Sequence, residues 1–144
     1  MISKLESVER MLRGYSALSS ECEQLERVIK SLNKERTRAM HSKVYTDERK
    51  KKIAEAASAA ALTLSELQLG KIAQQLEIEN HINKLQPELA YVIRGKYILR
   101  MHARDIAREM SVQYIKTYSE RQIYRFIESA KAQMADNLKK LKSS

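Results

Sequence analysis

Apolar residues recur mostly at alternating steps of three and four along the first 40 residues, and this spacing constrains the fold more than any other feature. The members of the series are Leu5, Val8, Leu12, Tyr15, Leu18, Cys22, Leu25, Ile29, Leu32 and Ala39. Such spacing places them on one side of a helix and is typical of a coiled-coil seam. We therefore predict a long helix from Lys4 to Met40. Gly14 is expected to shorten or kink it, because glycine costs about 1 kcal/mol in a helix interior relative to alanine.

A second long helix is predicted after the segment 41–48, where the seam is lost. Thr46, followed by two acidic residues, is typical of a helix N-cap. Apolar residues then continue at helical spacing to about Leu85, and a run of small residues at 54–61 would let another helix approach closely. Two long helices joined by a short turn predict an antiparallel, coiled-coil-like hairpin over residues 1–84. The seam would be buried either within this hairpin or between two copies of the chain.

Composition supports an all-α fold. Only three glycines and one proline interrupt 144 residues, and the chain is rich in good helix formers. Positive charge is concentrated towards the C-terminus: residues 1–83 contain fourteen Lys and Arg against twelve Asp and Glu, whereas residues 84–144 contain thirteen against six. Seven of the nine net charges therefore fall in the shorter part, which should bind a polyanion. The basic cluster at 49–52 more simply marks a solvated helix start.

Membrane proteins, secreted proteins and enzymes do not fit the sequence. No apolar run approaches the roughly 20 residues that a membrane span requires, and the single cysteine, Cys22, cannot form an intramolecular disulfide. Cys22 lies on the seam and is expected to be a small buried hydrophobe. We expect a cytoplasmic protein that does not bind membranes.

Residues suited to catalysis or to metal binding are not grouped in the sequence. There is no glycine-rich phosphate loop, no metal-ligand spacing and no nucleophile motif. His41, His81 and His102 lie far apart and are expected to be solvent-facing or packed. We therefore expect no enzymatic activity, no cofactor and no metal.

Residues 85–144 are predicted to form a DNA-binding domain with a helix-turn-helix. Pro87 marks the start of a third helix. A short amphipathic helix follows, with Ile106, Ala107 and Met110 on one face, and Ser119 is a good N-cap for a further helix. That last helix is expected to bury Ile123, Ile127, Ala130 and Met134 and to expose Glu120, Arg121, Gln122, Tyr124 and Arg125.

The exposed face of the last predicted helix carries the residue types that read DNA. Arg pairs bidentately with guanine and Gln with adenine when they lie in the first turns of a helix in the major groove. The DNA-binding candidates in this segment are Ser119, Glu120, Arg121, Gln122, Tyr124 and Arg125. Contacts to phosphates are expected from Arg104, Arg108, Lys139, Lys140 and Lys142.

The segment from Ser111 to Thr117 leaves two registers open for the helix-turn-helix. In the first, the recognition helix starts after Ser119, which caps well. In the second, the turn is Ser111-Val-Gln, and Gln113, Tyr114, Lys116 and Thr117 begin the recognition helix. Lys116 is therefore a further DNA-binding candidate.

Residues 85–138 resemble region four of bacterial sigma factors and, more closely, the RinA and ArpU families of phage transcriptional regulators. The matching elements are a leading helix from Leu85 to Ile98, Asp105-Ile-Ala-Arg-Glu-Met110, and Tyr118-Ser-Glu-Arg-Gln-Ile-Tyr-Arg125. The resemblance implies that Ser119, Arg121, Gln122 and Arg125 read DNA. It also implies regulation of phage or prophage genes, with activation of late genes expected. The segment 111–117 departs from the short turn of these families.

Three functions follow from these observations. The first is a sequence-specific DNA-binding regulator that forms a homodimer or a higher oligomer through its N-terminal helices, because one small motif makes few base contacts. The second is a phage terminase small subunit, which combines a DNA-binding helical motif with oligomerising helices. The third is a helical adaptor or inhibitor that binds RNA polymerase or a phage protein without binding DNA.

Overall fold

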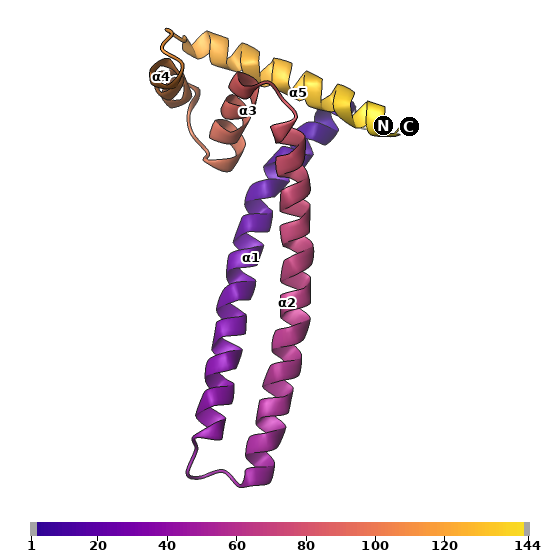
Figure 1. The fold of residues 1–144 in the computed structure, drawn as a ribbon, viewed down its shortest axis with the longest axis vertical. Coiled ribbons are helices and arrows are strands. Elements are labelled where there is room, and N and C mark those ends of the chain that lie inside the picture. Colours follow the sequence, from indigo (N-terminus) through magenta and orange to yellow (C-terminus); the bar gives the residue numbers. More distant parts are fainter. Residues whose placement is uncertain (1–2, 143–144) are drawn as a thin grey trace. The chain divides into compact units, whose positions relative to one another are not determined.

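The computed structural model describes the backbone of residues 3–142 and the side chains of residues 3–139 (Figure 1). The described chain consists of helices and their connections, with no β-strand among these residues, so the all-α prediction is confirmed. The elements in chain order are α1 (Lys4–Met40), α2 (Asp47–Asn83), α3 (Pro87–Ile93), the π-helical turn η1 (Arg94–Ile98), α4 (Ala103–Gln113) and α5 (Glu120–Lys142).

Local side-chain hydrogen bonds fix where the two long helices begin. At the start of α1, the backbone N–H of Glu6 donates to Oγ of Ser3 at 3.1 Å. The predicted N-cap of α2 is confirmed, because the backbone N–H of Arg49 donates to Oγ1 of Thr46 at 3.2 Å. The expectation that Gly14 shortens α1 is wrong: the helix runs through it for 37 residues. Burial of Val8 and Leu12 just before Gly14 offsets the small cost of the glycine.

The chain divides into two compact units. One, which we call the terminal unit, comprises Met1–Ala17 and Leu76–Ser144, and the other, the central unit, is Leu18–Gln75. These units do not coincide with the predicted domains 1–84 and 85–144, whose separate roles stay a prediction. The first turns of α1 and the last turns of α2 belong instead with the C-terminal helices.

The terminal unit has a well-packed apolar core. Helix α5 packs against α3 and α4, and α4 also contacts η1. The predicted inner faces are confirmed, since Ile106 and Met110 on α4 and Ile123 and Ile127 on α5 are at most 2% exposed. The largest fully buried side chains of the unit are Val8, Leu12, Ile82, Val92, Ile93, Ile106, Met110, Ile123, Ile127 and Met134. Each such burial contributes about 1.5–3 kcal/mol, so this unit holds most of the apolar stabilisation.

Gly95 lets η1 lie close to α4. A Cβ atom at this position would meet Cγ1 of Ile106 at 3.0 Å, and Ile106 is fully buried. A larger residue at position 95 would therefore push into a side chain that has no room to move. After the π-helical turn, the backbone passes through Arg100, whose φ is +57°.

Glu9 ties α1 to two other elements of the terminal unit. Its carboxylate accepts hydrogen bonds from the Tyr97 hydroxyl, from Nζ of Lys131 at 3.2 Å and from Nε of Arg13 at 2.6 Å. Burial would raise the pKa of Glu9, but the hydrogen bonds from Tyr97, Arg13 and Lys131 outweigh it and lower the pKa to about 2. Burial and the bond to Glu9 raise the pKa of Tyr97 well above its ordinary value.

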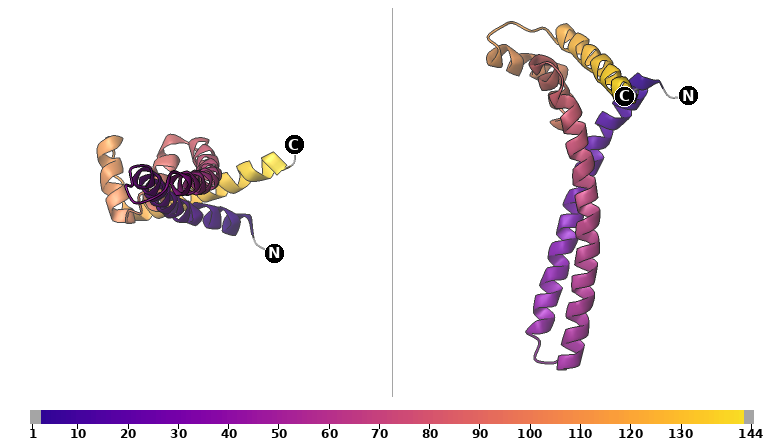
Figure 2. Two further views of the ribbon diagram at one scale, coloured as in Figure 1. Left: turned by 90° about the horizontal axis from the view of Figure 1, so that it is seen from below. Right: turned by 45° about the vertical axis from the view of Figure 1, so that its right-hand side comes forward.

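The central unit is a pair of antiparallel helix segments that run side by side (Figures 1 and 2). Cross-helix bonds set its register: they join Gln75 to Ser19, Lys71 to Glu21, Gln68 to Glu26 and Arg36 to Ser58. Residue numbers fall along α2 as they rise along α1, which defines the antiparallel direction.

The apolar seam of the central unit is only partly covered. Of residues 18–75, all of which the structure describes, only Ala39 and Ala57 are buried. The expectation of a buried Cys22 is wrong, since the residue is half-buried and its Sγ lies 3.8 Å from Oε1 of Gln75. Two helices have no third element to close their seam, so apolar positions in this unit stay in partial contact with water.

Candidate nucleic-acid interface

The junction between α4 and α5 has one defined register. Helix α4 ends at Gln113 and α5 begins at Glu120, so the alternative in which a recognition helix begins at Gln113 is not the one that the structure adopts. The backbone N–H of Gln122 donates to Oγ of Ser119 at 3.2 Å, and the N–H of Ser119 donates to Oε1 of Gln122 at 2.8 Å. This reciprocal capping box fixes the first turn of α5.

The capping box changes what Gln122 is able to do. A bidentate contact to adenine requires both the amide oxygen and the amide nitrogen of a glutamine. Here the oxygen of Gln122 is already bonded to Ser119. The structure therefore gives Gln122 a capping role, and its predicted role in reading adenine would require the cap to open. The pattern Ser-x-x-Gln could have shown this from the sequence.

The outward face of α5 carries the predicted DNA-reading residues. Its inner face is buried in the core, whereas the residues of the first two turns that point away from it are all exposed: Glu120, Arg121, Gln122, Tyr124 and Arg125. Arg121 and Arg125 are four residues apart, so they lie one above the other on this face. A packed inner face gives these side chains a rigid base.

Helix α4 contributes a second exposed basic pair. Arg104 and Arg108 are one turn apart and exposed, while Ala103 and Ala107 beside them are buried. On the adjoining side, the Tyr91 hydroxyl donates to Oε2 of Glu109 at 3.2 Å and links α4 to α3. Because α4 and α5 contact each other, the two basic pairs stand on neighbouring helices.

The arginines of these two pairs have no protein partner. Within residues 3–139, none of the guanidinium groups of Arg104, Arg108, Arg121 and Arg125 forms an ion pair or a hydrogen bond. Lys131, further along α5, instead pairs with Glu9 at 3.2 Å and with Glu128 at 3.1 Å. The cations near the junction are free to bind an anion, whereas the cation further along α5 serves the fold.

An aromatic row supports the junction, and the sequence analysis missed it. Tyr91 and Tyr114 meet edge to face with ring centroids 6.1 Å apart, and Tyr118 continues the row to Tyr114 at 6.5 Å and to Phe126 at 6.0 Å. The backbone N–H of Tyr118 also donates to Oγ of Ser111 at 3.1 Å. These ring contacts and this hydrogen bond thus hold the connection between α4 and α5 at Tyr114, where it begins, and at Tyr118, near its end.

Ile115 is a second feature that the sequence analysis missed. Its φ is +53°, in the left-handed region that β-branched residues rarely adopt, and its side chain is 90% exposed. Val112, on the last turn of α4, is also 78% exposed. Two apolar side chains therefore face solvent beside the basic pairs. Lys116, in the same connection, is exposed too.

The other candidate residues do not belong to the junction between α4 and α5. Lys139 is exposed near the end of α5, and the side chains of Lys140 and Lys142 lie outside those that the structure describes. His41 and His102 are exposed, and His81 is buried with no hydrogen-bond partner for its Nδ1 among the described residues. No three His, Cys, Asp or Glu side chains of the described chain gather as metal ligands would. No helix in the described range combines the length and apolar character of a membrane span.

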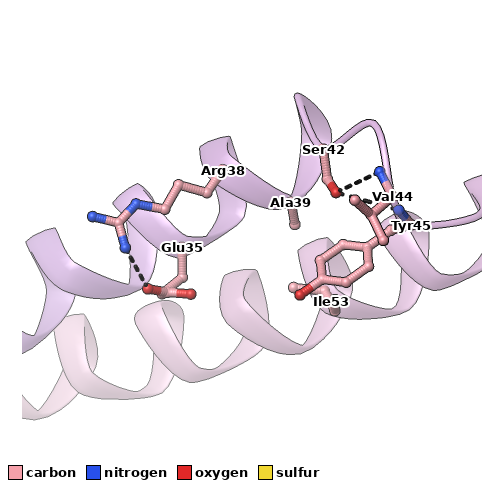
Figure 3. Close-up of a pocket in the computed structure, with 7 residues that line it drawn as sticks. All are labelled: Glu35, Arg38, Ala39, Ser42, Val44, Tyr45 and Ile53. Carbon is pink, nitrogen blue, oxygen red and sulfur yellow. Dashed lines mark hydrogen bonds and ion pairs between the residues drawn. The ribbon is translucent and has the colours of Figure 1, made fainter.

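A pocket in the central unit lies where α1 leads into α2 (Figure 3). Several of its polar groups are bonded to one another: Nη1 of Arg38 donates to Glu35 at 3.2 Å, and Oγ of Ser42 accepts the backbone N–H groups of Val44 and Tyr45. The lining contains no histidine, cysteine or lysine. We assign this pocket to the packing of the connection.

Comparisons of this chain with protein-family models, with curated proteins and with solved structures find no match. The resemblance to phage regulators therefore rests on the motifs at residues 85–138 alone.

Proposed function

We propose that this chain binds duplex DNA through the first turns of α5 and the exposed face of α4. The observation that carries the proposal is the presence of four exposed arginines without protein partners on two helices that pack on a common core. Guanidinium groups bind phosphates and guanine edges bidentately, and an unpaired one loses no existing contact when it does so.

The two basic pairs have different roles in this proposal. Arg121 and Arg125 on α5 reach base edges in a major groove, and Glu120 accepts a hydrogen bond from cytosine N4. Arg104 and Arg108 on α4 contact phosphates, which position the protein without reading sequence.

Three neighbouring residues complete the proposed interface. Tyr124 packs beside the bases, Lys116 binds phosphate from the connection, and Ser119 with its partner Gln122 holds the first turn of α5 in place.

In this proposal α4, its connection and α5 act as a helix-turn-helix, with α5 as the recognition helix. The small buried Ala107 on α4 and the buried inner face of α5 support this interpretation, as does the capping box at Ser119. The connection of six residues, 114–119, is longer than the tight turn of the motif. Because residues 85–138 resemble the RinA and ArpU families, we propose that the chain regulates phage or prophage genes and activates late genes.

The test is fluorescence anisotropy with duplexes selected from a random pool, over a series of salt concentrations. The three phosphate contacts of Arg104, Arg108 and Lys116 predict a slope of log K against log salt of roughly −3 for each bound chain. The double variant Arg121→Ala, Arg125→Ala should lose at least about tenfold in affinity for the selected duplex. Arg121→Lys keeps the charge and should lose selectivity while retaining binding to random duplex.

A matched control separates recognition from general basicity. Lys34→Ala with Lys51→Ala removes two exposed positive charges from the central unit, and it should leave affinity within about twofold of the original chain. If this control and the α5 double variant weaken binding equally, or if no duplex is selected over random DNA, the proposal is wrong.

A further inference from the structure

Ile115, in the connection between α4 and α5, has a backbone conformation that its own side chain opposes. Tyr114 caps the end of α4, and its N–H donates to the carbonyl oxygen of Met110 at 2.9 Å. Ile115 follows with φ of +53°, at the position where a glycine or an asparagine commonly ends a helix. For a β-branched residue this conformation is a steric outlier. The side chain is 90% exposed, so the fold gains almost no apolar burial in return.

The connection is held on both sides of Ile115. The rings of Tyr114 and Tyr118 meet edge to face with centroids 6.5 Å apart, and the N–H of Tyr118 donates to Oγ of Ser111 at 3.1 Å. Tyr118 is buried, whereas residues 115–117 are all exposed. Strained residues persist where the surrounding structure fixes them, and they cluster at binding sites. Ile115 therefore projects into solvent from a fixed part of the terminal unit.

Val112 connects Ile115 with the basic pair of α4. Arg104, Arg108 and Val112 follow one another at steps of four residues, so they lie along one face of α4. All three are exposed, Val112 by 78%. The face that carries the two unpaired arginines thus becomes apolar in its last turn, just before the chain reaches Ile115.

We propose that Ile115 contacts the C5-methyl group of a thymine, an inference that rests on the DNA binding proposed above. The unpaired arginines of α4 and α5 favour a polyanion as the partner of this surface. Between Glu109 and Glu120 the only charged residue is Lys116, so the connection itself has no carboxylate that would repel phosphates.

The thymine methyl group is the apolar group that base edges present in the major groove. The connection leads directly into the first turn of α5, which enters that groove in the proposed function. Contact with the methyl group removes the Ile115 side chain from water, which is the burial that the free chain does not supply. Ile115 is then a specificity-determining residue, and it favours thymine at one position of the DNA site.

The experiment replaces thymine by deoxyuridine, which exchanges the methyl group for hydrogen and leaves the pairing edge of the base unchanged. The probe is the duplex selected for the full chain, with its thymines replaced one at a time, and fluorescence anisotropy measures the affinity. At one position the replacement should weaken binding about three- to fivefold, which is the effect of leaving one methyl group unburied. Replacement of thymines outside the site should leave the affinity unchanged.

Three variants assign this preference to the Ile115 side chain. Ile115→Ala should bind the thymine and deoxyuridine duplexes equally well, whereas Ile115→Val keeps a branched apolar side chain and should still prefer thymine. Val44→Ala is the matched control, because Val44 is 89% exposed in the connection between α1 and α2, outside the proposed interface. It should keep the full preference. Circular dichroism checks that each variant is folded.

The ratio of the two affinities distinguishes a contact from a structural role. If Ile115 only shapes the connection, Ile115→Ala weakens both duplexes alike and the preference for thymine remains, which overturns the proposal. The proposal is also overturned if no thymine replacement changes the affinity of the original chain, or if Val44→Ala loses the preference as Ile115→Ala does.

The same measurements separate this proposal from the DNA binding on which it rests. If a duplex is selected and the double variant Arg121→Ala, Arg125→Ala loses it, while no thymine replacement matters, DNA binding stands and the role of Ile115 is wrong. If no duplex is selected over random DNA, both proposals are wrong.

Discussion

The terminal and central units are both built from helices, yet they differ in how much they bury. The terminal unit encloses ten large apolar side chains completely, whereas residues 18–75 bury only two alanines. The difference lies in the number of elements around the apolar faces: α5 crosses α3 and α4 in the first case, and two helices lie against each other in the second. Helical periodicity alone therefore does not make a core.

The largest expected effect on stability comes from truncating one apolar side chain in each unit. Ile127→Ala, in the terminal unit, should lower the free energy of unfolding by about 2–5 kcal/mol, because it leaves a cavity among fixed neighbours. Leu64→Ala, at a half-buried position of the central unit, should cost only about 1–2 kcal/mol. Urea unfolding followed by circular dichroism measures both. Equal losses would show that the two units are packed alike.

The Glu9 cluster should make the terminal unit sensitive to acid. The pKa of Glu9 lies at about 2 in the folded chain against an ordinary value of 4.5, so its stabilisation is present above pH 4.5 and is lost as the pH falls towards 2. Allowing for the partial exposure of the side chain, Glu9→Gln should cost about 1–2 kcal/mol at neutral pH and flatten the pH dependence in that window.

A matched carboxylate in the central unit provides the contrast for Glu9. Glu26 is about half exposed, and Glu26→Gln should cost at most about 0.5 kcal/mol. Thermal melts of both variants from pH 2 to 7 measure the difference. A Glu9 variant that follows the original chain across this range would contradict the role given to the cluster.

Two glycines should respond to alanine with opposite signs. Gly70→Ala in the central unit meets nothing within 4 Å and should stabilise the helix by about 0.5–1 kcal/mol. Gly95→Ala in the terminal unit places a Cβ 3.0 Å from a buried side-chain atom of Ile106 and should destabilise by about 1 kcal/mol. Differential scanning calorimetry resolves the sign, and a stabilising Gly95→Ala would show that the packing around η1 is loose.

The smallest effect is expected at Ile115, where the terminal unit holds a strained backbone. Ile115→Gly removes the Cβ clash of the left-handed conformation but adds flexibility to the unfolded chain, so a net gain of about 0.5 kcal/mol is expected. The same change at Ile29, in the middle of α1, should destabilise by about 1 kcal/mol or more. A loss of stability at position 115 would mean that the exposed side chain makes a contact of its own.

Features that depend on nearby residues were predictable from the sequence. The N-cap at Thr46, the proline start at Pro87 and the buried faces of α4 and α5 follow from local spacing, and the structure confirms them. Between the two registers of the candidate interface, the capping strength of Ser119 favoured the one that the structure adopts. The capping role of Gln122 was predictable in the same way, because it lies three residues after Ser119.

Features that depend on distant residues could not be predicted in this way. Glu9 meets Tyr97 and Lys131, which are 88 and 122 residues away, and no periodicity links them. The face of α2 that meets α1 was hidden for another reason: steps of three and four fit more than one face of this helix. The burial of Ala57 and the cross-helix bonds of Gln68, Lys71 and Gln75 show which face meets α1.

The contact between Glu9 and Lys131 also has a consequence for synthesis of the chain. The ribosome releases Glu9 long before Lys131, so the terminal unit cannot be completed until almost the whole described chain has emerged. Joining two points 122 residues apart along a disordered chain is slow and entropically costly. The central unit lies between them in sequence, and its open end is closed by the bond between Ser19 and Gln75. When that pair of helices is in place, the separation to be closed between Glu9 and Lys131 falls from 122 to about 66 residues, because the 56 residues between Ser19 and Gln75 are already bridged.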